Sequence, residues 1–169
     1  VQPWISFHAA RGPLLAARRQ GSQLTDLIVY TDPPQGTAAE LANVLPGLLI
    51  GCRRPFLIAP EEPVESIGSH IIIAWNPDDE AASAIRQARD FLPYAEKVEV
   101  AMIADDEASA ETEIARPLAY LACHGVKAEP RIIVDKTGNA GEIILNTFEK
   151  SGADLLVMGA YGHSRVREF

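Results

Sequence analysis

Short apolar runs alternate with helical patterns along the second half of the chain. The continuously apolar run at 71–75 is typical of a strand that is buried on both faces of a parallel sheet, and with three further runs it gives four expected strands. They lie at 71–75, 98–103, 132–134 and 155–158. Between them, apolar positions recur at the spacing of an amphipathic helix. This alternation predicts an α/β protein with a doubly wound, Rossmann-like parallel sheet and right-handed crossovers.

Polar residues and prolines set the expected ends of the helices between these strands. Asp78 is the expected N-cap of a helix with apolar positions over 81–92, because its carboxylate can accept from free backbone N–H groups. The next helix is predicted at 114–123, with Pro117 in the first turn, where a missing N–H costs little. A capping-box pattern at 139–142 is expected to start the last helix.

An apolar string with a leading aspartate occurs twice. Asp26–Tyr30 reappears as Asp154–Met158, and each copy follows a helical pattern that ends near a glycine. Two copies of one supersecondary unit explain this repeat. We therefore expect a partial first unit at 1–60, a linker rich in proline and glutamate at 61–68, and a second unit at 69–169.

The two expected units are incomplete in opposite ways. In the first, strands are predicted at 4–7, 27–30 and 56–59, with helices at 14–19 and 38–50. The first unit therefore lacks the opening β-α pairs of the second. The second unit is expected to lack the closing strand that the first unit has.

Charge and cysteine content narrow the classes of function. The net charge of −8 repels nucleic acid and anionic membranes, so a phosphate ligand would have to be held by local geometry. Cys52 and Cys123 fit no metal or disulfide spacing, and we expect both to be small buried residues. No run reaches the roughly 18 apolar residues that span a membrane, and no signal-peptide pattern opens the chain. We expect a cytoplasmic protein in a reducing compartment.

The most specific string of the chain is 153–164: an aspartate, an apolar strand, then Met-Gly-x-x-Gly-His-Ser. This string resembles the signature of the universal stress protein family. The segments 72–76, 124–126 and 51–60 are similar to the first strand, the approach to the third strand and the last strand of that family. The chain thus looks like a tandem member in which both units are partly truncated.

The resemblance implies an adenine-nucleotide alpha-hydrolase-like fold in two tandem units, paired within the chain or as a homodimer. Many members of the family bind ATP through Gly-x-x-Gly and a later Gly-Ser or Gly-Thr; many others bind none. Mg²⁺ is a candidate companion of ATP here, although the sequence assigns no carboxylate to a metal. Gly159 and Gly162 fill the first two positions of that pattern. The third position falls after Phe169, so we read the sequence as part of a longer pattern.

The glycine loop has a physical basis of its own. A strand that ends in a glycine-rich turn and leads into a helix presents free amides and the helix dipole to an anion. Gly159 follows the strand and Gly162 is expected to open the next helix, at the carboxyl edge of the sheet where doubly wound proteins bind ligands. The alternative is that both glycines only form a tight turn.

Further binding residues come from the resemblance. Asn76 stands where the family commonly has an aspartate that contacts the nucleoside, or else it caps the turn before Pro77. Ile103 matches a position that packs on adenine, or else it is ordinary core. Beside the glycines, the residues assigned to the loop are Met158, His163 and Ser164. The alternative is that the basic first turn of the helix after the loop is a solvated surface and contacts no phosphate.

The chain is therefore interpreted as a stress-response regulator that binds ATP or another adenine nucleotide in its second unit. The alternative is a dimerisation or interaction module of the same family that binds no nucleotide. No general base is placed by the sequence, so slow ATP hydrolysis is the most that we expect. Cys123 and His124 are neighbours on a helix and do not face each other, and His70 has no clustered partner in the sequence.

Overall fold

The computed structural model describes residues 24–31, 46–47, 49, 54–60 and 62–160 of the 169. The chain divides into two compact units, Val1–Glu62 and Pro63–Phe169. The strand and helix expected at 4–7 and 14–19 lie outside the described residues. The interpretation of the two units as tandem copies stays a prediction.

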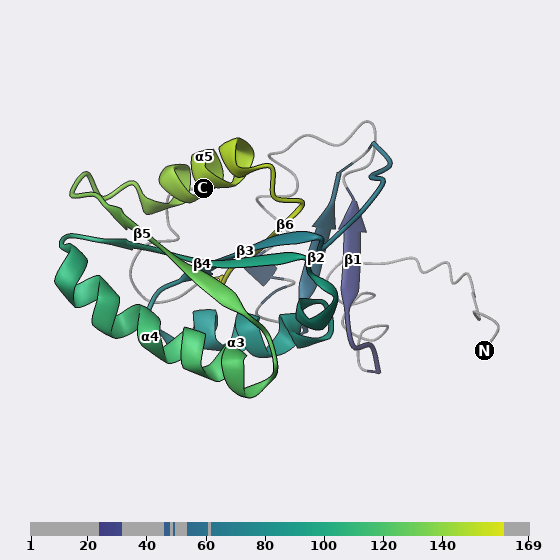
Figure 1. The fold of residues 1–169 in the computed structure, drawn as a ribbon. Coiled ribbons are helices and arrows are strands. Elements are labelled where there is room, and N and C mark those ends of the chain that lie inside the picture. Colours follow the sequence, from purple (N-terminus) through teal and green to yellow (C-terminus); the bar gives the residue numbers. More distant parts are fainter. Residues whose placement is uncertain (1–23, 32–45, 48, 50–53, 61, 161–169) are drawn as a thin grey trace. The chain divides into compact units, whose positions relative to one another are not determined.

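The second unit is built on a four-stranded sheet in which every pair of neighbours is parallel (Figure 1). The strands are β3 (His70–Trp75), β4 (Lys97–Ala104), β5 (Ala128–Val134) and β6 (Leu155–Val157). Their order in the sheet is β5-β4-β3-β6. The chain therefore adds strands on one side of β3 and then crosses to the other side. The predicted parallel α/β fold is confirmed.

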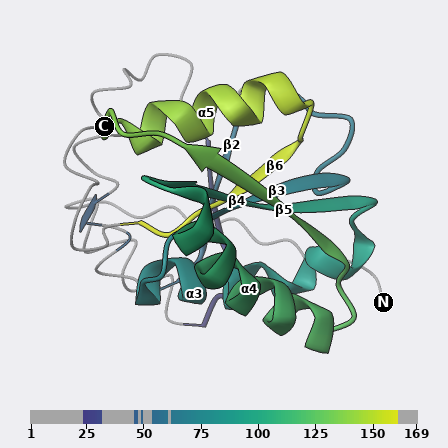
Figure 2. The same cartoon turned by 60° about the vertical axis from the view of Figure 1, so that its left-hand side comes forward.

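Helices cover both faces of this sheet, as Figures 1 and 2 show. The helices α3 (Asp79–Gln87) and α4 (Glu107–Cys123) lie on one face, and α5 (Ala140–Ser151) lies on the other. A single-turn 3₁₀ helix at Ala88–Asp90 and another at Leu92–Tyr94 join α3 to β4. Apolar helical positions were expected up to residue 92, but the α-helix ends at Gln87 and 3₁₀ turns follow it.

The core lies on both sides of β3, as its unbroken apolar sequence requires. Ile71, Ile72 and Ile73 are fully buried although their side chains alternate between the faces. On the α5 face, Ile72 packs with Ala101 of β4 and Ile144 of α5. Burying one isoleucine side chain contributes about 1.5–3 kcal/mol, so this strand is a major source of stability.

Helix α4 begins earlier than the sequence pattern indicates. The carboxylate of Asp106 caps it by accepting from the backbone N–H of Ser109 at 2.9 Å. Pro117 consequently lies inside the helix and not in its first turn, so that prediction is wrong. An interior proline removes one helix hydrogen bond. Pro117 is buried, and its ring packs on the apolar side of the helix, which offsets part of that cost.

α5 begins after Asn139, as expected, but two details predicted for the helices are wrong. Asn139 is the N-cap of α5, but its amide donates to the Glu142 carboxylate, and no side-chain cap bond to the described backbone forms. Cys123 is exposed and not core. It lies two residues after the buried Leu121, and two residues turn an α-helix by about 200°, which points Cys123 to solvent.

The described part of the first unit holds a parallel pair of strands and helical backbone at 46–47 and 49. β1 (Ile28–Thr31) and β2 (Phe56–Ala59) lie where strands were expected, and they pair in the register Ile28↔Phe56. The backbone N–H of Ile28 donates to the carbonyl of Pro55 at 3.0 Å.

Within the described ranges, the helices are too short or too polar to cross a lipid bilayer.

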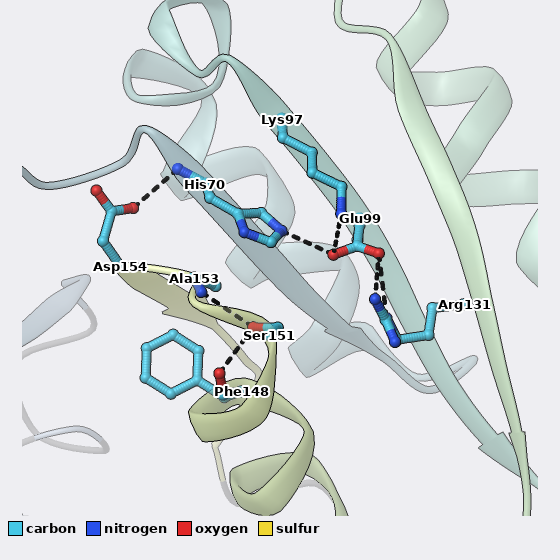
Figure 3. Close-up of polar contacts among 8 residues, drawn as sticks. All are labelled: His70, Lys97, Glu99, Arg131, Phe148, Ser151, Ala153 and Asp154. Carbon is cyan, nitrogen blue, oxygen red and sulfur yellow. Dashed lines mark hydrogen bonds and ion pairs between the residues drawn. The ribbon is translucent and has the colours of Figure 1, made fainter.

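The carboxylate of Asp154 holds the starts of β3 and β6 together (Figure 3). It accepts from the backbone N–H groups of Gly68, Ser69 and His70 at 2.9–3.1 Å and from the hydroxyl of Ser66 at 3.1 Å. Partial burial raises the pKa of Asp154, but these hydrogen bonds outweigh it and leave the pKa below its usual value. A charged acceptor for several backbone donors is worth more than a neutral one.

Replacing Asp154 by asparagine is expected to lower the free energy of unfolding by about 1–3 kcal/mol, because an N–H₂ group then faces backbone donors. Urea unfolding at neutral pH measures this loss. Asp26 occupies the same point of the repeated string but is exposed. Asp26→Asn is therefore the matched control, and an equal loss in both variants would contradict the role given to Asp154.

Candidate functional site

The carboxyl ends of β3 and β6 form the edge at which a ligand site is expected. These two strands are neighbours in the register Ile73↔Val157, and the chain changes direction across the sheet between them. In doubly wound proteins, ligands bind in the crevice at such a switch point. Asn76 follows β3 directly, and Gly159 follows β6 after one residue. The structure thus brings these two expected site residues to one edge.

Gly159 lies directly against the first turn of α3. A Cβ atom added to it would stand 2.7 Å from the backbone nitrogen of Ala81 and 2.7 Å from the carbonyl carbon of Glu80. Real Cβ atoms do not approach backbone this closely, so any side chain here displaces the helix or the loop. The need for glycine therefore follows from packing alone, whether or not a phosphate binds.

The N-terminus of α3 is capped by one carboxylate and carries two more acidic side chains. Asp78 is the N-cap, as predicted, and its Oδ1 accepts from the N–H of Ala81 at 2.8 Å. Asp79 and Glu80 add two further acidic groups to the first turn. These charges interact favourably with the helix dipole, but they repel an anion that approaches α3. A phosphate would have to lie on the β6 side of the edge.

Asn76 is exposed, and its amide is part of the turn before α3. Its Nδ2 donates to Oδ2 of Asp78 at 2.8 Å. This contact supports the interpretation of Asn76 as a turn residue. Its side-chain oxygen is not used in that bond, and contact with a nucleoside stays a prediction.

Trp75, the last residue of β3, has a buried donor without a partner. The residue is 8% exposed, and its indole Nε1 makes no hydrogen bond to any described residue. An unpaired buried donor costs about 1–3 kcal/mol. Such groups in folded proteins are usually paired with a water or a ligand. Trp75 therefore adds an unsatisfied donor to the end of the strand that borders the edge.

The remaining expected site residues divide between the core, the surface and the part outside the described residues. Ile103 is half-buried and packs against the cluster of Ile72, Ala101 and Ile144, which supports its role as core. Met158 is 40% exposed and follows β6, which ends at Val157, so the predicted strand is one residue too long. Outside the described residues lie Gly162, His163 and Ser164.

A second polar cluster lies near the amino ends of the strands and centres on Glu99 of β4 (Figure 3). Glu99 is 5% exposed. Its Oε2 lies 2.7 Å from Nε2 of His70 and 3.1 Å from Nζ of Lys97. Its Oε1 accepts from Nη2 and Nε of Arg131 at 2.6 and 3.1 Å. The expectation that His70 has no partner is wrong, because strand pairing brings Glu99 beside it.

These contacts control the ionisation of Glu99. Burial raises its pKa, but hydrogen bonds from His70, Arg131 and Lys97, with the charge of Arg131, together lower it from 4.5 to about 2. Both oxygens are occupied by donors, so the carboxylate has no free position for a substrate proton. We interpret the Glu99 cluster as a structural ion-pair network. Its signal in the sequence was a lone glutamate within the apolar run 98–103.

Two other features do not belong to the carboxyl edge. Among the residues that the structure describes, no three side chains of the metal-binding types converge. A surface hollow of about 300 Å³ is lined by Arg89, Asp90, Pro93, Tyr94 and His124. These residues lie in the 3₁₀ turns after α3 and at the end of α4, and the hollow includes none of the expected ligand residues.

Gly159→Ala is expected to destabilise the folded chain by about 1–3 kcal/mol, because the added methyl group overlaps the α3 backbone. The thermal unfolding midpoint measures this effect without any ligand. An unchanged midpoint would show that the loop moves freely away from α3 and would contradict the close packing.

The Glu99 network predicts a specific acid sensitivity. In the unfolded chain Glu99 takes up a proton near its ordinary pKa of 4.5, whereas in the folded chain it stays ionised until about 2. Its contribution to stability is therefore complete above about pH 4.5 and is lost as the pH falls from 4.5 towards 2.

Glu99→Gln tests this linkage. The variant is expected to be less stable at pH 7, since Arg131 and Lys97 lose their carboxylate, and to lose less stability than the wild type between pH 7 and pH 3. Urea unfolding at both pH values measures the difference. Glu129→Gln removes one exposed charge opposite Glu99 on β5 and is the control. Equal acid losses in all three proteins would refute the linkage.

Comparison with known proteins bears on the fold. No protein-family model matches the chain, and no curated protein matches its sequence. A universal stress protein from Archaeoglobus fulgidus superposes with a TM-score of 0.66 at 14% identity, over 85% of this chain and 54% of that one. The chain thus spans about half the length of that structure.

Two smaller proteins also match in structure. Protein Rv1636 from Mycobacterium tuberculosis has a TM-score of 0.47 at 23% identity, over 61% of this chain and 79% of that one. A protein of the universal stress protein family from Burkholderia pseudomallei has a TM-score of 0.42 at 19% identity, over 57% and 85%. From the Archaeoglobus superposition and the strand order, the chain has the fold of the universal stress proteins.

Proposed function

We propose that this chain is a stress-response protein that binds ATP or another adenine nucleotide at the carboxyl edge of its second unit. The binding shifts a conformation or a partner interface, and the chain is not an efficient enzyme. Mg²⁺ accompanies the nucleotide. The residues assigned to the site are Asn76, Ile103, Met158, Gly159, Gly162, His163 and Ser164.

The observation that carries this proposal is the geometry of the switch point. β3 and β6 end side by side, and a glycine follows β6 where backbone amides become available to a ligand. The unpaired indole N–H of Trp75 at the end of β3 adds a donor that an acceptor on a ligand or a water would satisfy. Backbone amides and one buried donor suit a nucleotide better than a cationic ligand.

The charge distribution determines how phosphates are held. Asp78, Asp79 and Glu80 form an acidic group beside Gly159. A polyphosphate at this edge needs a counterion between itself and these carboxylates, and Mg²⁺ supplies it. We therefore expect ATP to bind much more weakly without Mg²⁺. A nucleoside without phosphates would show no such dependence.

The second candidate function is an interaction module that binds no nucleotide. It is favoured by the hydrogen bonds that already engage Asn76 and the N-terminus of α3. In that case Gly159 serves only the packing against α3. The two functions differ in what a nucleotide does to the folded state, since selective binding must stabilise it.

The test is the thermal unfolding midpoint of the full chain with and without ATP and Mg²⁺. A ligand at about one hundred times its dissociation constant stabilises by about 2.7 kcal/mol, so a clear rise is expected. Mass spectrometry of the supernatant after denaturing the purified protein shows whether nucleotide is carried along. A midpoint that saturating ATP with Mg²⁺ leaves unchanged would favour the interaction module.

Asn76→Ala is expected to weaken ATP binding about tenfold while the chain stays folded, because Asn76 is exposed and contacts only the turn. The control is Asn139→Ala. Asn139 is likewise exposed and donates to a nearby carboxylate, but it precedes α5 after β5, away from the switch point. Titration calorimetry measures both. Equal affinities in the two variants would remove Asn76 from the site.

A further inference from the structure

The surface hollow beside the 3₁₀ turns lies toward the amino edge of the sheet, opposite the edge of the candidate nucleotide site. Its lining residues belong to the turns that lead into β4 and to His124, which follows α4 and leads towards β5. Its volume is about 300 Å³. Sites for small molecules begin at roughly this size, so the hollow can hold a compact ligand.

Arg89 and Asp90 bring one positive and one negative charge to the hollow. Both residues are exposed, and neither side chain has a hydrogen bond or an ion pair with any residue that the structure describes. A guanidinium donates to a carboxylate, and a carboxylate accepts from an ammonium group. The hollow thus offers one partner for each charge of a zwitterion.

The other three lining residues all carry rings: Pro93, Tyr94 and His124. Tyr94 is 85% exposed, which leaves most of its ring without contacts in the folded chain. Aromatic rings pack favourably on one another in offset or edge-to-face arrangements. The lining therefore suits a ligand that carries an aromatic ring beside its charges.

Local contacts hold these groups in place before any ligand arrives. The backbone N–H of Tyr94 donates to the carbonyl of Phe91 at 3.2 Å, and the buried Leu92 anchors the turn between them. The ring of His124 lies against that of Tyr120, with 4.6 Å between the ring centroids. A site whose groups are already ordered loses less entropy on binding.

The surrounding charges favour a ligand that has no net charge. The end of α4 carries the negative end of the helix dipole, and its last turn holds no basic residue, so it attracts an ammonium group. The net charge of −8 repels a free anion at long range but not a zwitterion.

We propose that this hollow binds a free aromatic α-amino acid. The guanidinium of Arg89 donates to the α-carboxylate, the carboxylate of Asp90 accepts from the α-ammonium group, and the aromatic ring packs on Tyr94. The terminus of a peptide has only one of these two charges and would leave Arg89 or Asp90 without a partner. This inference does not depend on the proposed nucleotide site.

A nuclear magnetic resonance titration of the full chain with L-phenylalanine tests the proposal. The amides of 89–94 and 124 are expected to shift and to saturate. N-acetyl-L-phenylalanine has lost the ammonium group, L-phenylalaninamide has lost the carboxylate, and glycine has no ring. Each of these probes is expected to bind about tenfold more weakly than L-phenylalanine.

Arg89→Gln and Asp90→Asn are each expected to raise the dissociation constant for L-phenylalanine about tenfold. The matched control is Arg86→Gln, because Arg86 is exposed near the end of α3 but does not line the hollow. Thermal unfolding confirms that each variant is folded.

The absence of saturable shifts up to the solubility limit of L-phenylalanine would overturn the proposal. So would an acetylated or amidated probe that binds as tightly as the free amino acid. A loss of affinity in Arg86→Gln equal to that in Arg89→Gln would overturn it as well, since the effect would then be one of general charge.

Discussion

The parallel pairing of β3 with β6 is the contact on which the rest of the second unit depends. It closes the sheet on the side of β3 that the first two crossovers leave open, and it creates the switch point. The carboxylate of Asp154 joins the amino ends of these strands, and Gly159 against α3 fixes the position of the chain after their carboxyl ends. One strand pair is thus held at both ends by different means, a charge-assisted hydrogen-bond group and a close backbone contact.

β3, β4 and β6 were predictable because burial leaves a short apolar run that local sequence shows directly. β5 begins at Ala128, ahead of the predicted run 132–134, because its first residues are exposed or half-buried and partly polar. The ends of the helices were harder to predict from the sequence. α4 starts at Glu107 because the Asp106 carboxylate caps it, in a segment with few apolar residues to indicate a helix. The start of α4 was predicted too late, because a proline such as Pro117 is expected in the first turn of a helix. Asn139 was correctly predicted to precede α5, but its side chain donates to a carboxylate and does not cap the helix backbone.

The ion pairs of Glu99 could not be predicted from sequence patterns, for a different reason. Glu99 meets His70 and Arg131 only because three strands lie in a particular register. Burial removes water from the Glu99 carboxylate. Hydrogen bonds from three side chains replace the hydrogen bonds that water would make. Register depends on the whole sheet, and no local spacing encodes it. The candidate ligand site was predictable in part. Its place at the edge of the sheet followed from the predicted topology. That the acidic first turn of α3 lies beside it could be seen only in the structure.

The contact between Gly159 and the α3 backbone affects how related sequences are to be compared. A glycine that packing demands is expected whether or not the chain binds a nucleotide. Its presence in an aligned sequence then records a shared architecture. A side chain that the fold does not require carries different information. Asn76 is exposed and contacts only Asp78 in the turn, so its identity is free to vary without disturbing the packing of Gly159 on α3.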